Sequence, residues 1–578
     1  MCGIVGITSS SQFSVKDELL SRLKKLEYRG YDSVGFATSD GTVIKGAGEL
    51  DGFLSRIPDI KTKTAISHTR WATHGGVTDT NAHPHFDEKR EIFIVHNGII
   101  ENFSEMKAEL QAKGYLFSTQ TDSEVIAHFF ADAFKDGLDW IAAAKKFLKK
   151  AKGTFAILLI KKGEERIYAL KRDSPLTLGL AGDMLILASD IYAFSDKTNK
   201  AIFFNDDEFA IVHAGGYEFY NAEGNPIKKE IKEFKWSRQE EDKHEHPHYM
   251  IKEIHEQPIA AERLIRSLES EQAGKVARFV ELIKNAERVV FTAAGTSYFA
   301  TLLGVYFLNK QNIMAHTLIA SEFENYVYVN DKTLVIAVSQ SGETMDVVSA
   351  LKYAKAKGAR IASIVNVPYS TVQRMSDVSI EIMAGQEVCV AATKTFTNQV
   401  ITLLFLASKF GFNVDFGSLP LQIEKTIANN EEKVKELAQA IYKKNDIYIL
   451  GRGLSYPSAR EFAHKLKEIA YVHAEGMMGG ELKHGTLALI DEGTPVFSLI
   501  ADNDIGMINN TKEVEARGAK VYKVSAGDDA DFQVPATNRG VFSILAVIIG
   551  QLLAYYIAVQ RGLPIDKPRH LAKSVTVK

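Results

Sequence analysis

The second half of the chain contains an internal duplication, and this feature limits its possible folds more than any other. Three segments recur at nearly constant offsets of 158, 161 and 160 positions. VVFTAAGTSY at 289–298 corresponds to IYILGRGLSY at 447–456, TLVIAV at 333–338 to TPVFSL at 494–499, and GARIASIV at 358–365 to GAKVYKVS at 518–525. A repeat this long is a duplicated domain rather than a solenoid unit. Because apolar strands alternate with helical patterns, we predict two doubly wound α/β domains, each with a parallel sheet covered by helices on both faces.

The first part of the chain, to about residue 220, has a different pattern. Short strand-like runs at 92–95, 155–160 and 184–188 are separated by turns, and helical periodicity occurs near 15–26 and 123–134. We therefore predict a sheet-dominated domain flanked by helices. The charged stretch at 227–247 predicts a linker, partly helical at most. Its alternating histidines, His244, His246 and His248, are more typical of a solvated segment than of a metal site.

Charge and cysteine content exclude several classes of protein. The 578 residues have 69 Lys and Arg against 72 Asp and Glu, a net charge of -3, so no basic surface for nucleic acid is indicated. Two cysteines cannot form a disulfide framework and indicate a reducing compartment. No targeting segment is visible, and the apolar run at 541–559 is interpreted as a buried helix rather than a membrane span. We expect a soluble, cytoplasmic protein without a nucleic-acid or membrane partner.

Cys2 is a candidate nucleophile if Met1 is removed. A thiol beside a free α-amine carries its own general base, since that amine titrates near pH 8. Taken alone, Cys2 favours the simpler interpretation of an apolar residue in a first strand. HTRWATHG at 68–75, HNG at 96–98 and TDSE at 121–124 change that balance. Arg70 can pair with a carboxylate, Asp122 with an ammonium group, and Asn97 with the Gly98 N–H can form an oxyanion hole.

These motifs, together with CGIVG at 2–6 and YRGYDS at 28–33, resemble the class II glutamine amidotransferases. The resemblance implies an N-terminal-nucleophile hydrolase with four layers, α/β/β/α, in which Cys2 attacks the side-chain amide of L-glutamine and releases ammonia. It further implies the following roles: Arg70 binds the glutamine α-carboxylate, Asp122 binds its α-amine, Thr73 and His74 complete the pocket, Trp71 gates the ammonia path, and Tyr31 belongs to the lid.

Polar loops in the duplicated half predict an anion site. Thr296 and Ser297 lie where a strand runs into a helix, and SQSGET at 339–344 occupies the same place one strand later. Hydroxyl and amide groups at helix starts suit a phosphate, although ordinary N-capping explains each loop separately. The second copy has Ile500-Ala501-Asp502 where the first has Ser339-Gln340-Ser341, so we expect the copies to differ in role.

Three further segments carry titratable groups. Lys465 and Glu468 share a helical face, for which an exposed ion pair is the usual explanation. His484 lies in the glycine-flanked loop GELKHG at 480–485. The tail after 566 reads as a basic solvated terminus, but a docked lysine such as Lys573 could form an imine with a ketose.

In this order the motifs resemble the glucosamine-6-phosphate synthase family over essentially the whole chain. The resemblance implies that fructose 6-phosphate forms an imine with Lys573, that Glu468 moves a proton between C1 and C2 with support from Lys465, and that His484, contributed by the partner of a homodimer, assists ring opening. No cofactor or metal is expected. The implied sugar-phosphate residues are Thr296, Ser297, Ser339, Gln340, Ser341, Thr344 and Val390. The implied domains are 2–220 (glutaminase), 221–250 (linker), 251–430 and 431–565 (sugar isomerase) and 566–578 (catalytic tail).

Some alternatives stay open, and one departure from the family pattern is visible. Ala392 stands where the family usually has serine, which puts one sugar contact in doubt. Asparagine synthesis would need a Ser-Gly-Gly-x-Asp-Ser loop, which the sequence lacks. Paired sugar isomerase domains can also act as sensors that bind without turnover. Retention of Glu468, His484 and Lys573, and of a complete glutamine pocket, favours the enzyme.

Overall fold

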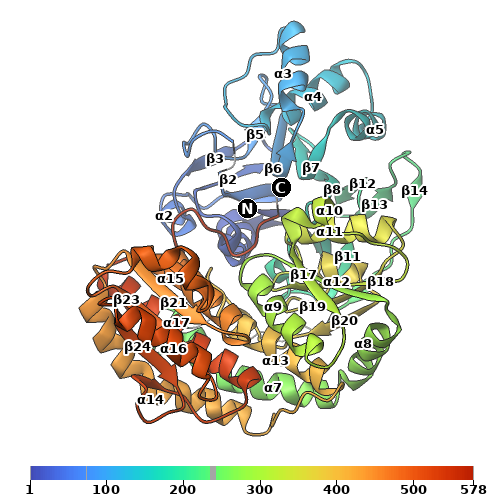
Figure 1. The fold of residues 1–578 in the computed structure, drawn as a ribbon. Helices are drawn as coiled ribbons and strands as arrows, with labels where there is room; N and C mark the ends of the chain where they lie inside the picture. The colour runs from blue at the N-terminus through green and yellow to red at the C-terminus, as the bar shows by residue number, and fades with distance from the viewer. Residues whose placement is uncertain (1, 73, 235–242, 577–578) are drawn as a thin grey trace. The chain divides into compact units, whose positions relative to one another are not determined.

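The computed structural model of the chain describes residues 2–72, 74–234 and 243–576. These residues form two compact units. The N-terminal unit comprises Met1–Arg238 with Ser574–Lys578, and the C-terminal unit comprises Gln239–Lys573 (Figure 1). Each unit is described by itself below.

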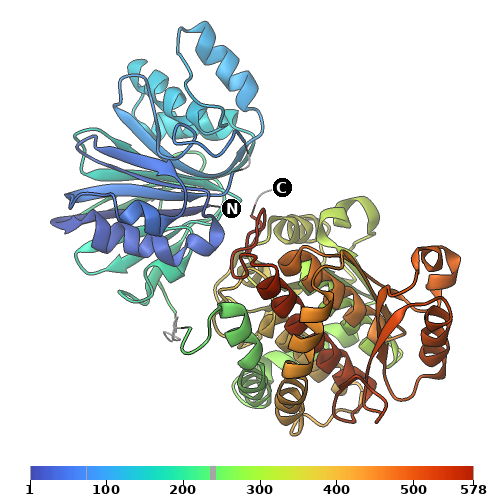
Figure 2. The ribbon, with the colours of Figure 1, turned by 90° about the vertical axis from the view of Figure 1, so that its left-hand side faces the viewer.

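The N-terminal unit contains two antiparallel sheets that stack face to face (Figure 2). The eight-stranded sheet has the order β15-β11-β9-β10-β1-β4-β2-β3, with bounds β1 Gly3–Ser14, β2 Ser33–Thr38, β3 Val43–Ala47, β4 Lys61–Arg70, β9 Thr177–Ala181, β10 Met184–Ala188, β11 Lys200–Phe203 and β15 Lys232–Glu233. The seven-stranded sheet has the order β14-β13-β12-β8-β7-β6-β5, with bounds β5 His85–Phe86, β6 Ile92–Ile100, β7 Gly153–Lys161, β8 Arg166–Arg172, β12 Glu208–His213, β13 Gly216–Tyr220 and β14 Pro226–Ile227. Alternating apolar residues on the inner faces, such as Ile4, Ile66 and Leu158, fill the space between the sheets.

Helices cover the outer faces of both sheets. The outer face of the seven-stranded sheet is covered by α4 (Glu124–Lys135) and α5 (Trp140–Lys150), whose Phe130 and Phe147 pack on it; α3 (Phe103–Ala112) packs beside α4. The π-helical η1 (Val15–Leu20) and α1 (Ser21–Lys25) pack on β1 and β4 of the other sheet. The expected α/β/β/α order is therefore confirmed. The remaining short elements are η2 (Glu27–Arg29), α2 (Leu50–Leu54) and η3 (Ile191–Ala193).

The structure differs from the expected linker. β14 and β15 lie inside the stretch predicted to be unpacked, and they pair with β13 and β11 respectively. Phe234 is buried against Phe194. The packed N-terminal unit thus extends past residue 220 to at least 234, because neighbouring strands in the sheets hold two-residue strands that the charged local sequence does not predict.

The C-terminal unit contains two five-stranded sheets, and every strand pair in them is parallel. The first has the order β17-β16-β18-β19-β20, with bounds β16 Arg288–Ala293, β17 Ala315–Ile319, β18 Thr333–Ser339, β19 Arg360–Val365 and β20 Val378–Glu381. The second repeats this order as β22-β21-β23-β24-β25, with bounds β21 Asp446–Gly451, β22 His473–Met478, β23 Pro495–Ile500, β24 Lys520–Ser525 and β25 Phe532–Gln533. The duplication predicted from sequence is confirmed, since β16, β18 and β19 correspond to β21, β23 and β24.

Helices join the two copies into one unit with a shared apolar core. The bounds are α6 Tyr249–His255, α7 Gln257–Glu269, α8 Ala273–Asn285, α9 Gly295–Asn309, α10 Phe323–Tyr326, α11 Met345–Ala356, α12 Thr371–Met375, α13 Lys394–Ser408, α14 Leu419–Ile441, α15 Ser455–Ala470, α16 Ile505–Glu515 and α17 Arg539–Gln560, with the short turns η4 Ala320–Glu322, η5 Glu481–His484 and η6 Thr486–Leu489. The boundary expected at 430–431 falls inside α14, which packs on both α7 and α17.

The apolar run at 541–559 forms most of α17. This helix is long and apolar enough to cross a membrane, but 94% of its most apolar window is buried. It packs against α14 and α15, and Gly550 lets Phe462 of α15 approach its backbone. The interpretation of this run as a buried helix is confirmed.

Candidate active sites

Cys2 lies at the start of β1, next to the end of β4. Its Sγ accepts a hydrogen bond from the backbone N–H of Trp71, at 3.4 Å. The Asn97 side-chain amide donates to the carbonyl oxygen of Cys2, at 2.9 Å, and thus lies beside the thiol. Burial raises the pKa of the Cys2 thiol. The protein therefore holds a neutral thiol at pH 7 close to the proposed oxyanion donor.

Gly98 follows Asn97 in β6, and its backbone has a left-handed φ of +123°. A Cβ atom there would lie 2.0 Å from the carbonyl oxygen of Thr154 in the neighbouring strand β7. Only glycine fits this close approach. The backbone beside Asn97 is fixed in this way.

Arg70 ends β4 and is almost fully buried. Its guanidinium donates to the backbone carbonyl oxygens of His74, Gly75 and Gly76, at 3.2 Å for Gly76. It therefore holds the loop that follows the HTRW segment, and within the described residues it forms no salt bridge with a carboxylate. The rings of His74 and Phe103 are in edge contact. Thr73, predicted to bind glutamine, lies outside the described residues.

Asp122 is also almost fully buried, and its carboxylate accepts a hydrogen bond from the Ile100 N–H, at 2.8 Å. It is not the N-cap of α4, which is Ser123. Electrostatic contributions to the pKa of Arg70 come from Cys2, Asp32 and Asp122, after the larger effect of burial, which lowers it. Cys2 and Asp122 therefore both lie within electrostatic reach of Arg70. Tyr31 lies half-buried in the loop before β2, and Trp71 contacts Cys2 through its backbone.

The two predicted anion loops meet in the C-terminal unit. β16 and β18 are adjacent parallel strands, so the segments after them, 294–297 and 339–344, lie at the same edge of the sheet. The order of strand addition reverses here, because β17 lies on one side of β16 and the next strand, β18, lies on the other. Open α/β sheets bind ligands at such a switch point. Ser339 Oγ accepts from the Gly342 N–H at 3.0 Å, and Ser341 Oγ accepts from the Glu343 N–H at 3.1 Å. These bonds hold a tight loop whose Thr344 is the N-cap of α11.

Thr296 connects this edge to the second copy. Its hydroxyl accepts from Lys465 Nζ at 2.9 Å and donates to Glu461 Oε1 at 3.2 Å. Lys465 is fully buried and also pairs with Glu468, so the exposed ion pair suggested by the sequence is wrong. Ser297 Oγ accepts from Gln399 Nε2 at 2.9 Å.

The charges around Lys465 set the protonation of Glu468. Burial alone would lower the pKa of Lys465, but Glu461 and Glu468 outweigh this effect and raise it. Burial would raise the pKa of Glu468, but Lys465 and then His464 lower it well below its usual value. Glu468 is therefore a carboxylate at neutral pH and can act as a base.

Lys573 in the tail is almost fully buried and forms an ion pair with Glu387. Burial would raise the pKa of Glu387, but Lys573 outweighs it and lowers that pKa. Glu387 also accepts from the N–H groups of Thr393 and Thr395, at 2.9 and 3.1 Å. The sequence left two possibilities for the tail, a solvated terminus or a docked lysine. The structure shows the docked lysine. Val390 N–H donates to the Asp566 carbonyl, at 3.0 Å, beside this pair.

His484 is exposed on η5. Among the described residues, no hydrogen bond or ion pair joins His484 to Glu468 or Lys573.

Sequence reasoning missed two acidic residues. Glu387 holds Lys573, and Glu461 completes the group around Lys465. Glu461 lies four residues before Lys465, a helical spacing that could have signalled the contact. Glu387 is 186 positions from Lys573, and no local pattern could have paired them.

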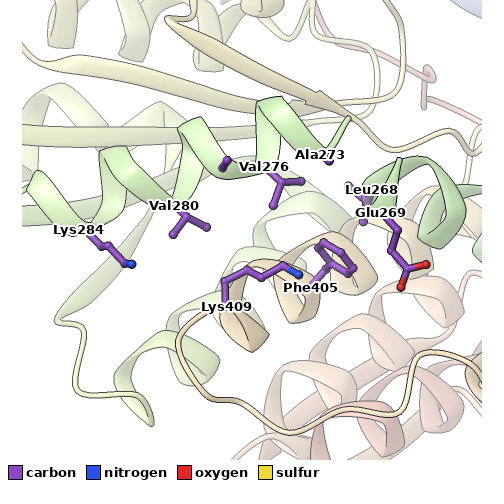
Figure 3. A pocket seen from close by; sticks show the side chains of 9 residues that line it. Leu268, Glu269, Ala273, Val276, Val280, Lys284, Phe405 and Lys409 are labelled. Carbon is purple, nitrogen blue, oxygen red and sulfur yellow. The ribbon is translucent and has the colours of Figure 1, made fainter. Parts of the chain in front are cut away.

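A shallow groove of about 430 Å³ lies between α8 and α13 and is lined by Val276, Val280, Lys284, Phe405 and Lys409, among others (Figure 3). None of the predicted site residues lines this groove, so we assign it no part in the chemistry.

Comparisons with known proteins identify the domains in which the two candidate sites lie. Residues 68–196 match the glutamine amidotransferase domain, and 282–409 and 440–533 match the SIS domain. The glutamine–fructose-6-phosphate aminotransferases (isomerizing) of Sulfurisphaera tokodaii and Sulfolobus acidocaldarius are 42% and 40% identical, over 100% of this chain and 100% of each relative. The C-terminal domain of glucosamine-fructose-6-phosphate aminotransferase from Francisella tularensis matches with a TM-score of 0.51 and 31% identity, covering 57% of this chain and 100% of that one.

The fold and sites define a glutamine amidotransferase joined in one chain to a pair of SIS domains. The full-length similarity is more specific. The chain belongs to the glutamine–fructose-6-phosphate aminotransferase (isomerizing) family.

Proposed function

We propose that the chain converts fructose 6-phosphate and L-glutamine to glucosamine 6-phosphate and glutamate, the first step of hexosamine synthesis in the cytoplasm. The observation that carries the proposal is the burial of Lys573 against Glu387 in the unit that also contains the hydroxyl loops and Glu468. A buried amine of this kind is suited to imine formation with a ketose.

Cys2 starts the reaction on glutamine. Since burial raises the pKa of its thiol, the thiol needs a base to become a nucleophile at pH 7. Removal of Met1 supplies that base, because the freed α-amine of Cys2 titrates near pH 8. The thiolate attacks the side-chain amide carbon, and Asn97 with the Gly98 N–H stabilises the oxyanion. Arg70, Thr73, His74 and Asp122 bind the amino-acid end, Tyr31 closes the pocket, and Trp71 gates the path of the released ammonia.

The sugar reacts in the C-terminal unit. Its phosphate binds the hydroxyl and amide groups of Thr296, Ser297 and 339–344, with Val390 lining the sugar. Lys573 forms an imine at C2, ammonia then replaces the lysine nitrogen, and Glu468 transfers the proton between C1 and C2. The carboxylate form of Glu468, held by Lys465, supports its role as the base.

His484 assists ring opening from the partner subunit of a homodimer. Its exposure supports this role, and so do the exposed apolar side chains of Met478 and Leu489 in the same segment. Mixing His484→Ala and Lys573→Ala variants tests it. Half of randomly mixed dimers are hybrids with one complete site, so about one quarter of wild-type activity should return. If the mixture stays as inactive as its components, the site is not shared between subunits.

The overall reaction is tested with side-chain 15N-labelled glutamine and fructose 6-phosphate, followed by mass spectrometry. The label should appear in glucosamine 6-phosphate, and Cys2→Ala should abolish the transfer. Glu468→Gln should lower product formation by about 10²–10⁴-fold while glutamine hydrolysis continues. Sugar-phosphate binding without any glutamate would instead indicate a sensor.

A further inference from the structure

A second buried carboxyl group, Glu253, lies beside the Glu387–Lys573 pair, and the reaction proposed above gives it no role. Glu253 is on α6 and its side chain is 1% exposed. Its Oε1 accepts hydrogen bonds from the backbone N–H groups of Val388 and Cys389, the residues directly after Glu387, at 3.2 Å for Cys389. Its Oε2 is buried and has no hydrogen-bond partner among the residues that the structure describes.

The charged groups near Glu253 come from three segments of the chain. They are Lys252 of α6 with Glu256 directly after that helix, then Glu387, Cys389 and Lys394 of the segment 387–394, and Asp566 and Lys573 of the tail. Lys394 pairs with Glu256 at 2.6 Å, Lys252 pairs with Glu256 at 3.1 Å, and Lys573 pairs with Glu387. Asp566 accepts from the N–H groups at the start of α6. The cations are thus paired with other carboxylates.

This arrangement leaves Glu253 without a counter-ion in the described part of the chain. Burial first, and the neighbouring carboxylate of Glu387 second, raise the pKa of Glu253 to about 8. Two carboxyl groups that share a small buried space do not both ionise readily. At neutral pH Glu253 is therefore a neutral acid, and Glu387 carries the negative charge.

We propose that Glu253 acts as a neutral positioning residue that limits the pocket to one negative charge beside Lys573, so that Lys573 can lose its proton and attack the sugar. The inference rests on the proposed function of Lys573. Glu387 accepts a proton from the lysine ammonium group, the freed amine nitrogen bonds to C2, and the carbonyl oxygen leaves as water with the protons that the nitrogen and Glu387 give up. A second ionised carboxylate would stabilise the ammonium form and oppose the first of these events.

The test is hydride trapping of the Lys573 adduct with fructose 6-phosphate in the full chain, without glutamine, between pH 6 and 10. Mass spectrometry of the Lys573 peptide gives the yield. Wild-type yield should level off or fall above pH 8, where Glu253 ionises. Glu253→Gln keeps a neutral group and an acceptor for the N–H groups of Val388 and Cys389. The adduct yield of this variant should therefore match that of wild type within about twofold at pH 7 and should keep rising through pH 9. Glu256→Gln is the matched control, because Glu256 lies three residues after Glu253, directly after the end of α6. The adduct yield of this variant should level off or fall above pH 8 as in wild type.

The outcomes separate this inference from the proposed function. If wild type forms no Lys573 adduct at any pH, the imine assignment itself fails. Glu253 is not a neutral positioning group if wild type forms the adduct and Glu253→Gln gives the same dependence of adduct yield on pH. The same conclusion follows if the folded variant gives less than a tenth of the wild-type yield at pH 7. Folding is checked by circular dichroism and by unchanged glutamine hydrolysis. Should the variant not fold, the wild-type profile decides, because a yield that rises through pH 9 without levelling overturns the proposal.

Discussion

Gly98 occupies a position that no larger residue can fill without moving the backbone. Its φ of +123° and its approach to Thr154 both exclude a Cβ atom. Asn97, the preceding residue, contacts Cys2. A shift at Gly98 therefore displaces the proposed oxyanion donors relative to the thiol.

For Gly98→Ala we expect glutamine hydrolysis to fall by about 10²–10³-fold, the effect of losing one oxyanion donor. Gly48→Ala is the matched control, since Gly48 has a φ of +105° but open space around its Cβ direction. That control should retain hydrolysis within a few-fold and lose only about 1 kcal/mol of stability. Steady-state glutaminase assays decide, and equal activity of the two variants would contradict the role given to Gly98.

Lys465 provides a test of a buried charge group. Lys465→Met removes the buried cation that Glu461 and Glu468 share, so we expect the free energy of unfolding to fall by about 3–5 kcal/mol. Lys467→Met, on the exposed side of α15, should stay within about 0.5 kcal/mol of wild type. Urea unfolding measures both, and similar values for the two variants would show that Lys465 is not needed to hold the carboxylates.

Site residues could be predicted from the sequence where they lie in motifs of the family that the chain resembles. Cys2 and Asn97 belong to two such motifs and are joined by a hydrogen bond, and Arg70 of a third motif lies within electrostatic reach of Cys2. The pairing of Lys573 with Glu387 and the burial of Lys465 could not be predicted, because they depend on how distant helices and the tail pack.

Strands and helices with a strong period were predicted correctly. β6, β7, β10 and α4 contain the runs expected from sequence, because apolar alternation and helical spacing report the buried face directly. β14 and β15 were missed, since two-residue strands have no period and exist through their neighbours. α14 likewise spans the boundary expected at 430–431. It packs on α17, which is distant in the chain, and local sequence does not predict such a contact.

Strands β4, β5 and β6 and the residues before β5 place four buried histidines together. His68 and His83 have ring centroids 4.0 Å apart, and those of His83 and His85 are 4.4 Å apart. His68 Nε2 bonds the carbonyl of His96, at 3.0 Å. Burial lowers the pKa of His68 to about 3 and also lowers the pKa values of His83, His85 and His96.

These histidines should make the N-terminal unit unstable in acid. They stay neutral when folded but bind protons near pH 6.5 when unfolded, so the unfolded state gains protons as pH falls below 6.5. Stability should therefore be full above pH 6.5 and decrease toward pH 3, by up to about 1.4 kcal/mol per histidine and pH unit. Hydrogen exchange of β4 and β6 amides, corrected for intrinsic rates, measures this. His83→Gln should reduce the loss of stability per pH unit below pH 6.5. The control His213→Asn changes a partly exposed histidine and should leave this loss unchanged. An unchanged loss in His83→Gln would refute the explanation.

The chain as a whole is two units with separate cores. The two N-terminal clusters of buried apolar residues span residues 4–220, and the C-terminal core runs from Met250 to Ile565. The sequence predicted a change of domain here, because short strand-like runs separated by turns give way to a repeated pattern of strand, loop and helix.

We expect the fragment 243–578 to fold alone, because its apolar core is complete without the N-terminal unit. It should unfold in one cooperative transition and still give the hydride-trapped Lys573 adduct with fructose 6-phosphate. Calorimetry and peptide mass spectrometry of the fragment and of the full chain provide the comparison. Absence of a cooperative transition in the fragment would mean that the two units depend on each other for stability.

The contact of Thr296 with Lys465 has a consequence for the history of the protein. One copy contributes the anion loops and the other contributes helix α15, with Lys465 and Glu468, so the duplication yielded a single composite centre instead of two equivalent ones. We therefore expect neither copy to be sufficient for the proposed chemistry without the other. A lineage that deleted either copy would lose the ancestral symmetry and the chemistry together, and mutations on the two sides of this contact are expected to be inherited as compensating pairs.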